Sequence, residues 1–286
     1  MLCKRVLLTG GSGFIGRNIK GYLSTVCTLY APARKELNLL DEEAVRKYLL
    51  ENKIDIVIHA ANPNPVKNHL DKQESMFEDS IRVFLNLYQA EDCYEKMYTL
   101  GSGAEYDKSK DIISIKEEEA GRSVPYDSYG LAKYTINKLV EQSSKQCNLR
   151  IFGCYGPTDH ESKFITHAIR CCMKGEAITI RQNCCFDYMQ VSDLGKILNY
   201  FIYHEPRYRV YNVCTGTRIS LKEIAWKVRE QMGTQNDIVV LKEGWNNEYT
   251  GCNKRLLSEI GSYQFMDLEE GIRIQIESER MNENIL

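Results

Sequence analysis

Residues 9 to 16, with the sequence TGGSGFIG, form a glycine-rich segment between a short apolar run at residues 6 to 8 and an amphipathic stretch. Its glycines recur at every third position, at Gly10, Gly13 and Gly16. Glycine lets the main chain approach a pyrophosphate closely and then start a helix whose positive end faces the phosphates. A plain glycine-rich loop stays open as an alternative. The flanking pattern favours a dinucleotide-binding turn with contacts from Gly10, Gly11, Ser12, Gly13, Phe14, Ile15 and Gly16.

Short apolar runs alternate with helix-length amphipathic stretches in the first half of the chain. This order is typical of a parallel sheet with helices on both faces, because parallel strands need a crossover connection. The predicted fold class is therefore α/β with a doubly wound parallel sheet. The strands are expected at residues 5–8, 26–30, 56–59, 96–100 and 149–152. The helices between them are expected at residues 14–23, 42–51, 76–88 and 128–143.

The regular alternation loosens after about residue 156, which predicts a smaller second lobe. A loop is expected at residues 157–162, a helix at 164–173 and another periodic stretch at 221–231. We assign residues 1–155 and 186–232 to a dinucleotide-binding domain. We assign residues 156–185 and 233–286 to a substrate-binding lobe.

Composition and charge exclude several classes of protein. The chain has 286 residues and a net charge of −2, so it offers no basic surface for nucleic acid or for a membrane. No apolar run approaches the roughly 18 residues of a membrane span. Eleven cysteines occur without a C-x-x-C pair, which favours free thiols in a reducing cytoplasm over disulfides or a metal site. We therefore expect a cytoplasmic enzyme without a metal.

Tyr129 and Lys133 are four residues apart in a predicted helix. Residues at this spacing share a helix face, so the ammonium group is expected to lie beside the phenol and to lower its pKa from about 10 toward neutrality. Such a tyrosine can act as a general acid or base. The Y-x-x-x-K pattern is common on helix surfaces, but its combination with the glycine-rich turn favours catalysis.

Ser102 follows the fourth predicted strand, at the edge of the sheet where ligands of doubly wound folds bind. Its hydroxyl could bind the same oxygen that Tyr129 protonates. A turn serine that only caps a loop is the alternative.

Six segments occur in the order and spacing of one known family. They are residues 9–16 (TGGSGFIG), 55–61 (DIVIHAA), 100–106 (LGSGAEY), 125–133 (PYDSYGLAK), 149–157 (LRIFGCYGP) and 187–193 (DYMQVSD). The chain thereby resembles the extended short-chain dehydrogenase/reductases, the NAD(P)-dependent sugar epimerase/dehydratase family. Within this family, residues 34–41 are most similar to the segment in GDP-fucose synthases and, more loosely, in dTDP-4-dehydrorhamnose reductases.

The resemblance implies a Rossmann domain that holds a dinucleotide and a small C-terminal lobe that closes over a nucleotide-linked sugar. Ser102, Tyr129 and Lys133 fall on the family's catalytic triad. Further cofactor contacts are implied for Asn38, Leu39, His59, Ala60, Ala61 and Leu100, besides Tyr129 and Lys133.

The residues after the second predicted strand bear on the choice of cofactor. An NAD-selective site places a carboxylate at the tip of this strand, where it accepts hydrogen bonds from the ribose hydroxyls. Glu36 lies several residues beyond the strand end, in the next turn. Arg34, and Arg17 at the start of the first helix, instead offer cations to a 2′-phosphate. The sequence therefore favours NADP(H) over NAD(H).

Two positions depart from the family pattern and concern the substrate. Gly153 stands where the family usually has an asparagine that reaches the sugar nucleotide, and Phe186 stands where it usually has an arginine. Arg170 and Arg181 could still pair with a diphosphate, but a different mode of substrate binding stays open. The predicted substrate residues are Ser102, Gly103, Tyr129, Gly153, Lys163, Arg170 and Arg181.

These features favour an NADPH-dependent reductase of a nucleotide-linked 4-keto-6-deoxy sugar. An epimerase or dehydratase that retains its cofactor, and a protein that senses NADP(H), are the alternatives. Ala104 and Lys163 stand where GDP-fucose synthases have a cysteine and a histidine, which predicts reduction without epimerisation. His160 and His167 stay open as alternatives for the histidine, but neither restores the acid missing at Ala104. The predicted helix at 76–88 is apolar around more of its circumference than one face of a sheet can cover. We therefore expect a homodimer formed through this helix and the one at 128–143.

Overall fold

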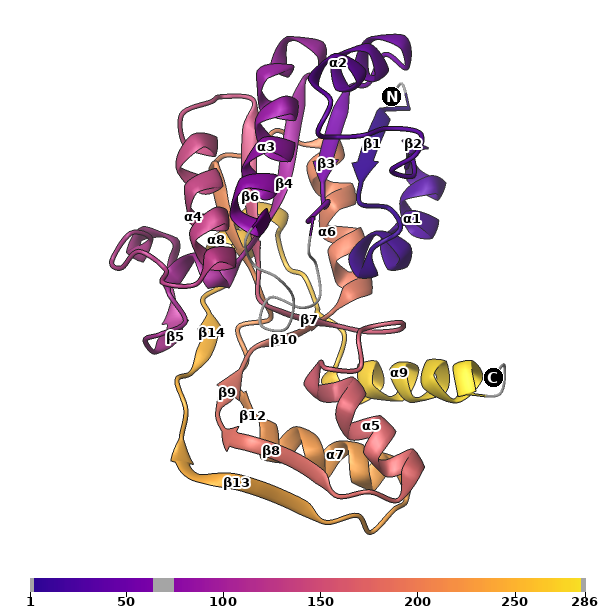
Figure 1. The fold of residues 1–286 in the computed structure, drawn as a ribbon, viewed down its shortest axis with the longest axis vertical. Helices are drawn as coiled ribbons and strands as arrows, with labels where there is room; N and C mark the ends of the chain where they lie inside the picture. The colour runs from indigo at the N-terminus through magenta and orange to yellow at the C-terminus, as the bar shows by residue number, and fades with distance from the viewer. Residues whose placement is uncertain (1–2, 64–74, 284–286) are drawn as a thin grey trace.

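A six-stranded parallel sheet forms the centre of the protein (Figure 1). The computed structural model describes residues 3–63 and 75–283. The strand order is β11-β6-β4-β3-β1-β2, and every neighbouring pair is parallel. The doubly wound α/β prediction is therefore confirmed. The strands are β1 (Arg5–Thr9), β2 (Thr28–Tyr30), β3 (Ile56–His59), β4 (Lys96–Ser102), β6 (Gln146–Ile151) and β11 (Val210–Val213).

Helices cover both faces of this sheet (Figure 1). One face packs against α1 (Phe14–Val26) and α6 (Val191–Tyr203). The other packs against α2 (Glu42–Glu51), α3 (Met76–Gln89) and α4 (Ser128–Val140). Successive residues of β1 point to opposite faces, so that Leu8 belongs to the first core and Leu7 to the second.

A second, smaller body has its own core (Figure 1). It consists of α5 (Phe164–Lys174), α7 (Leu221–Met232), α9 (Leu268–Glu283) and the parallel pair β8 (Ile178–Asn183) and β13 (Ile238–Trp245). Two segments pack across the predicted domain boundaries. The helix α7 packs in this lobe, whereas α8 (Lys254–Ile260) and the residues up to Phe265 pack on the core of the central sheet. The apolar faces of these segments determine the core in which they are buried. The periodicity of apolar residues in the sequence does not reveal which core that is.

Two small sheets join the central sheet to the lobe. In the first, β7 (Gly153–Tyr155) pairs with β10 (Tyr188–Gln190). The second has the order β12-β9-β14-β5 and contains β5 (Ile112–Ile115), β9 (Cys185–Phe186), β12 (Ile219–Ser220) and β14 (Tyr249–Gly251). Three single turns of 3-10 helix, at Glu91–Cys93, Gly103–Tyr106 and Glu117–Glu119, complete the described elements.

Most predicted elements lie within a few residues of the observed ones, and the helix at 42–51 has the predicted bounds. Five boundaries were wrong by two or three residues, of which the start of β6 at Gln146 and the end of α4 at Val140 are two. The helix α1 continues to Val26, which shortens β2 to Thr28–Tyr30. The strand β4 continues to Ser102, because this residue still pairs with Ile151 of β6.

Three further observations concern the whole chain. All eleven cysteines are free. Within residues 3–63 and 75–283, no helix combines the length and apolar character needed to cross a membrane. The same residues contain no cluster of potential metal ligands.

A buried ion pair fixes the turn that follows β4. Arg150 on β6 donates from Nε to Glu105 Oε2 at 2.5 Å, and each side chain is only 1% exposed. Glu105 Oε1 also accepts from the backbone N–H of Ser102 at 3.0 Å, and Asn148 donates to both carboxylate oxygens. Arg150 Nη1 donates to the hydroxyl of Tyr106 at 2.8 Å. The pair thus connects the end of β4 to β6.

We expect Glu105→Gln to lower the free energy of unfolding by about 3–5 kcal/mol, because it leaves the buried charge of Arg150 without its partner. Urea denaturation measures this loss. The matched control is Glu51→Gln, which removes a carboxylate from the exposed pair with Lys47, where the side chains are 63% and 73% exposed. The control should change stability little. Equal changes in the two variants would contradict a structural role of the buried pair.

Candidate active site

The glycine-rich turn lies at the carboxyl end of β1, beside β3. Gly10 has φ +71°, and a Cβ at this position would lie 2.8 Å from the backbone of Ala61. A Cβ at Gly16 would lie 2.3 Å from the carbonyl oxygen of Gly10. Only glycine fits these two positions. No side chain caps the first turn of α1, so its N–H groups can bind an anion.

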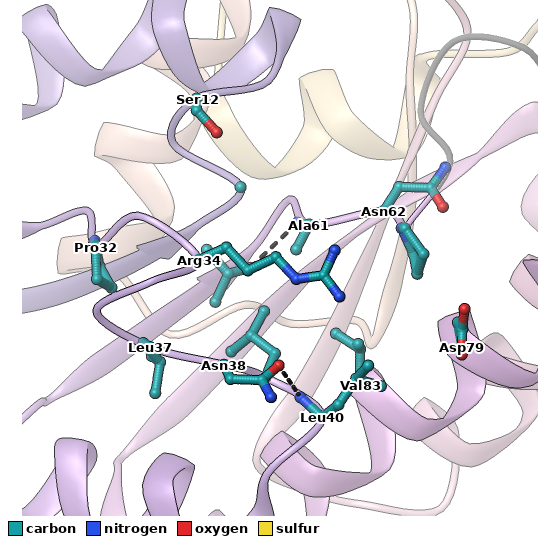
Figure 2. Close-up of a pocket in the computed structure, with 14 residues that line it drawn as sticks. Ser12, Pro32, Arg34, Leu37, Asn38, Leu40, Ala61, Asn62, Asp79 and Val83 are labelled. Carbon is teal, nitrogen blue, oxygen red and sulfur yellow. Dashed lines mark hydrogen bonds between the residues drawn. The ribbon is translucent and has the colours of Figure 1, made fainter.

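A cavity of about 230 Å³ adjoins this turn (Figure 2). Six of the predicted cofactor residues, from the turn, the segment after β2 and the loop after β3, line its wall: Gly10, Ser12, Arg34, Asn38, Leu39 and Ala61. Eight residues that were not predicted line it too: Thr9, Pro32, Leu37, Leu40, Asn62, Pro63, Asp79 and Val83. Residues such as Pro32, Asn62 and Pro63 could have been predicted to line the cavity, because they lie in loops that follow parallel strands. Asp79 and Val83 could not, because their place depends on the rotation of α3.

Arg34 is the cation of this cavity. Its side chain reaches across the cavity between the turn at Ser12 and the segment at Asn38 (Figure 2). Among the described residues, no carboxylate forms an ion pair with Arg34. Glu36 is held in the neighbouring turn, where its Oε2 accepts from the backbone N–H of Ala33 at 2.7 Å. Arg17 is exposed on α1 and does not line the cavity.

His59 ends β3 below the cavity and is buried. Its Nδ1 lies 3.0 Å from Oγ1 of Thr9, which also accepts from the backbone N–H of Ala61 at 3.2 Å. Burial and the charge of Lys133 lower the pKa of His59 to about 3, so this residue is neutral. Thr9 therefore holds the ends of β1 and β3 together. The close glycines and the free helix N-terminus together fit the pyrophosphate of a dinucleotide, and Arg34 adds a positive charge to the same cavity.

Three hydroxyl groups meet at the carboxyl end of β4. Ser102 is buried, and its Oγ accepts from the backbone N–H of Ala104 at 3.2 Å. The Ser102 hydroxyl lowers the pKa of both Tyr129 and Tyr249, which places the two phenols near it. Ser102 and Tyr129 come together as predicted from the sequence. Tyr249 was missed, because β14 joins this region only through its pairing with β5 and β9.

Lys133 lies one helical turn after Tyr129 and is buried. Its Nζ donates to the carbonyl oxygen of Leu100 at 2.9 Å and lies 6.0 Å from the centre of the Tyr129 ring. Burial lowers the pKa of Lys133 to about 8, and the charge of Glu105 opposes this shift. Lys133 therefore lies close to the phenol, but its hydrogen bond goes to the end of β4.

The expectation that Lys133 lowers the pKa of Tyr129 is wrong in this structure. Burial raises the pKa of Tyr129 above its usual value of 10, and the hydrogen bond with Ser102 offsets only part of this rise. The physical reason is that removal from water raises the free energy of the phenolate by more than the nearby Ser102 hydroxyl lowers it. Tyr129 is therefore protonated at neutral pH, which is the state that a proton donor needs.

The predicted substrate residues do not all lie together. Ala104 and Gly103 adjoin Ser102, and a Cβ at Gly103 would lie 2.6 Å from the hydroxyl of Tyr249. Lys163 is exposed at the start of α5, and Arg181 is exposed on β8, both in the lobe. Arg170 of α5 is engaged by Glu161 and Glu279, each at 2.8 Å. A role of Arg170 in holding a diphosphate would require these ion pairs to open.

The backbone around Gly153 leaves little room for a side chain. It pairs with Tyr188 across β7 and β10, and a Cβ at Gly153 would lie 2.6 Å from the carbonyl oxygen of Asp187. The backbone of β10 therefore fills the space into which an asparagine side chain at position 153 would extend. Phe186 packs on Tyr188 with ring centres 5.5 Å apart, so an aromatic group stands where the family has a cation.

We expect Gly153→Ala to lower the free energy of unfolding by about 1–3 kcal/mol, the usual cost of overpacking, because the backbone of Asp187 must move. Gly21→Ala is the matched control, since a Cβ at Gly21 in α1 meets nothing within 4 Å. The control should stabilise the protein by about 0.5–1 kcal/mol through helix propensity. Thermal and urea denaturation of both variants test the difference, and a neutral Gly153→Ala would contradict the close packing.

Comparison with known proteins agrees with this geometry. Residues 6–214 match the profile of the NAD dependent epimerase/dehydratase family. The chain is 25% identical to a GDP-L-colitose synthase of Yersinia pseudotuberculosis over 94% of its length and 95% of that protein. It is 23% identical to a dTDP-4-dehydro-6-deoxyglucose reductase of Escherichia coli, over 96% and 97% of the two chains.

The fold is shared with solved structures. A GDP-mannoheptose C4 reductase of Campylobacter jejuni, solved with NADP bound, superposes with a TM-score of 0.84 at 18% identity over 98% of this chain and 99% of that one. The family predicted from the six sequence segments is thus confirmed. The chain belongs to the NAD dependent epimerase/dehydratase family of NAD(P)-dependent enzymes.

Proposed function

We propose that the protein is an NADPH-dependent reductase of a nucleotide-linked 4-keto-6-deoxy sugar. The observation that carries the proposal is the protonated Tyr129 beside Ser102, at the same sheet edge as the cavity that contains Arg34. The names of the relatives support the substrate class, since they include a synthase and a reductase of nucleotide-linked deoxy sugars.

Each residue of the proposed site has a distinct role. NADPH supplies a hydride when it is bound. Tyr129 gives its proton to the keto oxygen, and Ser102 donates a hydrogen bond to the same oxygen. Lys133, fixed on the carbonyl of Leu100, holds its amino group 6.0 Å from the centre of the Tyr129 ring and would hold the nicotinamide ribose. The ion pair of Glu105 and Arg150 keeps the end of β4 in place during the reaction.

An epimerase or dehydratase that recycles its cofactor is the second candidate. Two observations favour the reductase. Ala104 is buried and has no exchangeable proton, and the ammonium group of Lys163 is exposed, so neither offers the acid and base that epimerisation needs. A sensor of NADP(H) is the third candidate, and the retained Tyr129 and Lys133 argue against it.

Consumption of the cofactor separates these candidates. The purified protein is incubated with NADPH and a panel of nucleotide-linked 4-keto-6-deoxy sugars, and NADPH and sugar are quantified. A reductase consumes one NADPH for each sugar reduced. Conversion of the sugar without loss of NADPH would indicate the epimerase or dehydratase, and binding of NADPH without conversion would indicate the sensor.

Tyr129→Phe should lower turnover at least about a hundredfold, the usual scale for loss of a general acid, with little change in cofactor affinity. Tyr134→Phe is the matched control, because Tyr134 lies on the same helix with its ring 5.4 Å from Nζ of Lys138. Steady-state kinetics measure both variants. Turnover of Tyr129→Phe within a few-fold of the parent would remove this residue from the mechanism.

We propose NADP(H) as the cofactor, and Arg34 as the residue that selects it. Arg34→Ala should weaken NADPH binding about tenfold or more, since a charge-assisted contact to phosphate is worth roughly 1.5–3 kcal/mol. Binding of NADH should be nearly unchanged. Titration calorimetry compares this variant with Lys35→Ala, in which the neighbouring exposed cation outside the cavity is removed. Equal losses for the two cofactors would assign Arg34 another role.

We further propose a homodimer formed through α3 and α4. Met76, Phe84 and Leu87 are buried, whereas Phe77 and Leu85 of α3 remain partly exposed. Light scattering should give twice the chain mass of 33.0 kDa at micromolar concentration, and a single-chain mass would contradict the dimer. The free cysteines support a proposed location in a reducing cytoplasm.

A further inference from the structure

Lys108 places an ammonium group beside the ring of Tyr129, from the loop that connects the turn after β4 to β5. Its Nζ lies 5.9 Å from the centre of the Tyr129 ring, and Nζ of Lys133 lies 6.0 Å from the same centre. Lys133 is buried and donates to the carbonyl of Leu100, whereas Lys108 is exposed. Among the described residues, no carboxylate forms an ion pair with Lys108. Its charge is therefore available to a ligand.

The backbone around Lys108 is held in place, although its side chain is exposed. Asp107 has φ +67° and ψ 91°, and residues other than glycine rarely adopt such a positive φ. Its buried carboxylate accepts from Oγ of Ser109 and from Oγ of Ser123, each at 2.6 Å. On the other side, Asn247 donates to the carbonyl oxygen of Lys108 at 3.3 Å. These contacts keep the strained loop, and with it Lys108, in one position at the edge of the site.

The protonation state of the phenol does not require Lys108. Burial raises the pKa of Tyr129, the hydroxyl of Ser102 lowers it, and the carboxylates of Glu105 and Asp127 raise it further. The charge of an exposed ammonium group is also screened by water and salt, which weakens its effect on a buried phenol. The position of Lys108 therefore favours a role in binding over a role in proton transfer.

The cations predicted to bind the diphosphate lie elsewhere. Arg170 is engaged by Glu161 and Glu279, each at 2.8 Å. Lys163 and Arg181 are exposed on α5 and β8 of the lobe. In contrast to these three residues, Lys108 lies directly beside the proton donor.

The strand β14 relates Lys108 to the position where the family usually has an arginine. Tyr249 of β14 pairs with Ile112 of β5, the strand that follows the loop of Lys108. On its other side, the same residue pairs with Phe186 of β9. A positive charge is therefore absent on one side of β14 and present on the other.

We propose that Lys108 is a substrate-binding residue that contacts the diphosphate of a nucleotide-linked sugar, at the phosphate attached to the sugar. This inference rests on the proposed function, which places the keto oxygen at Tyr129. In a 4-keto hexose, the carbon that carries the diphosphate lies across the six-membered ring from the keto carbon. A long side chain with an exposed ammonium group beside Tyr129 can reach this phosphate, and lysine binds phosphate oxygens as a point charge.

The test uses Lys108→Met, which removes the charge and keeps most of the length of the side chain. Titration calorimetry measures binding of GDP, UDP, CDP and dTDP, and of the corresponding monophosphates. The protein is first saturated with NADP⁺ or NAD⁺, whichever binds more tightly, so that the nucleotides do not enter the dinucleotide site. We expect the diphosphate to bind about tenfold more weakly, the scale of one charge-assisted contact, and the monophosphate to change less than about twofold. Unchanged binding, or equal losses for diphosphate and monophosphate, would overturn the proposal.

Lys110→Met is the matched control. Lys110 is exposed in the same loop, and its Nζ donates to Oγ of Ser123 at 2.9 Å. This variant should keep the affinity for the diphosphate, and Lys108→Arg, which retains a positive charge, should keep most of it. Equal losses in Lys108→Met and Lys110→Met would indicate a general effect of surface charge and contradict a specific contact.

Steady-state kinetics give a second readout. A contact to the non-reacting end of the substrate is made equally in the ground state and in the transition state. Lys108→Met should therefore raise KM about tenfold and change kcat less than about twofold. A fall of kcat at unchanged KM would instead assign Lys108 to proton transfer with Tyr129, and the diphosphate contact would be wrong.

The inference and the proposed function fail in different ways. If the wild-type protein reduces none of the sugars but Lys108→Met loses affinity for a diphosphate alone, the proposed function fails and the contact stands. If the protein reduces a sugar but Lys108→Met retains its affinity for the diphosphate, the contact fails and the function stands. Absence of binding of all four diphosphates to the wild-type protein would also overturn the contact.

Discussion

The buried pair of Glu105 and Arg150 is the interaction on which the geometry of the site depends. Two charges that are each 1% exposed are costly to remove from water, and such a pair persists only where further hydrogen bonds satisfy both partners. Here these bonds come from Ser102, Asn148 and Tyr106. Because one of them is the backbone N–H of Ser102, the pair sets the direction in which β4 ends. The same carboxylate supports the charge of Lys133, so structure and electrostatics at the site have one origin.

Burial, rather than the neighbouring lysine, controls the proton affinity of the two groups on α4. It raises the pKa of Tyr129 and lowers that of Lys133, in each case because the charged form loses contact with water. A protonated phenol is suited to give a proton to a keto oxygen, whereas oxidation of an alcohol requires the phenolate. The direction of the pKa shift of Tyr129 therefore leaves the phenol in the protonated state that a proton donor needs.

The sequence predicted what local pattern and topology determine. Alternating apolar runs located the strands, and the rule that parallel strands end at one edge placed Gly10 and Ser102 on the same side of the sheet. It did not predict contacts that depend on tertiary packing. Asp79 and Val83 reach the cavity through the rotation of α3, and Tyr249 reaches Ser102 through three strands that are far apart in the chain. The direction of the pKa shift of Tyr129 was missed for a similar reason. The spacing of residues in a helix indicates a neighbouring charge, but it does not indicate how far burial removes the phenol from solvent.

The departures at Gly153 and Phe186 have a common structural cause. The backbone of β10 runs so close to β7 that no side chain fits at Gly153, and Phe186, Tyr188 and Tyr249 form an aromatic group beside this pair. A polar amide and a cation are thus replaced by close backbone pairing and ring packing. Because Phe186 packs against Tyr249, whose hydroxyl would lie 2.6 Å from a Cβ at Gly103, a position that departs from the family pattern also shapes the turn after β4.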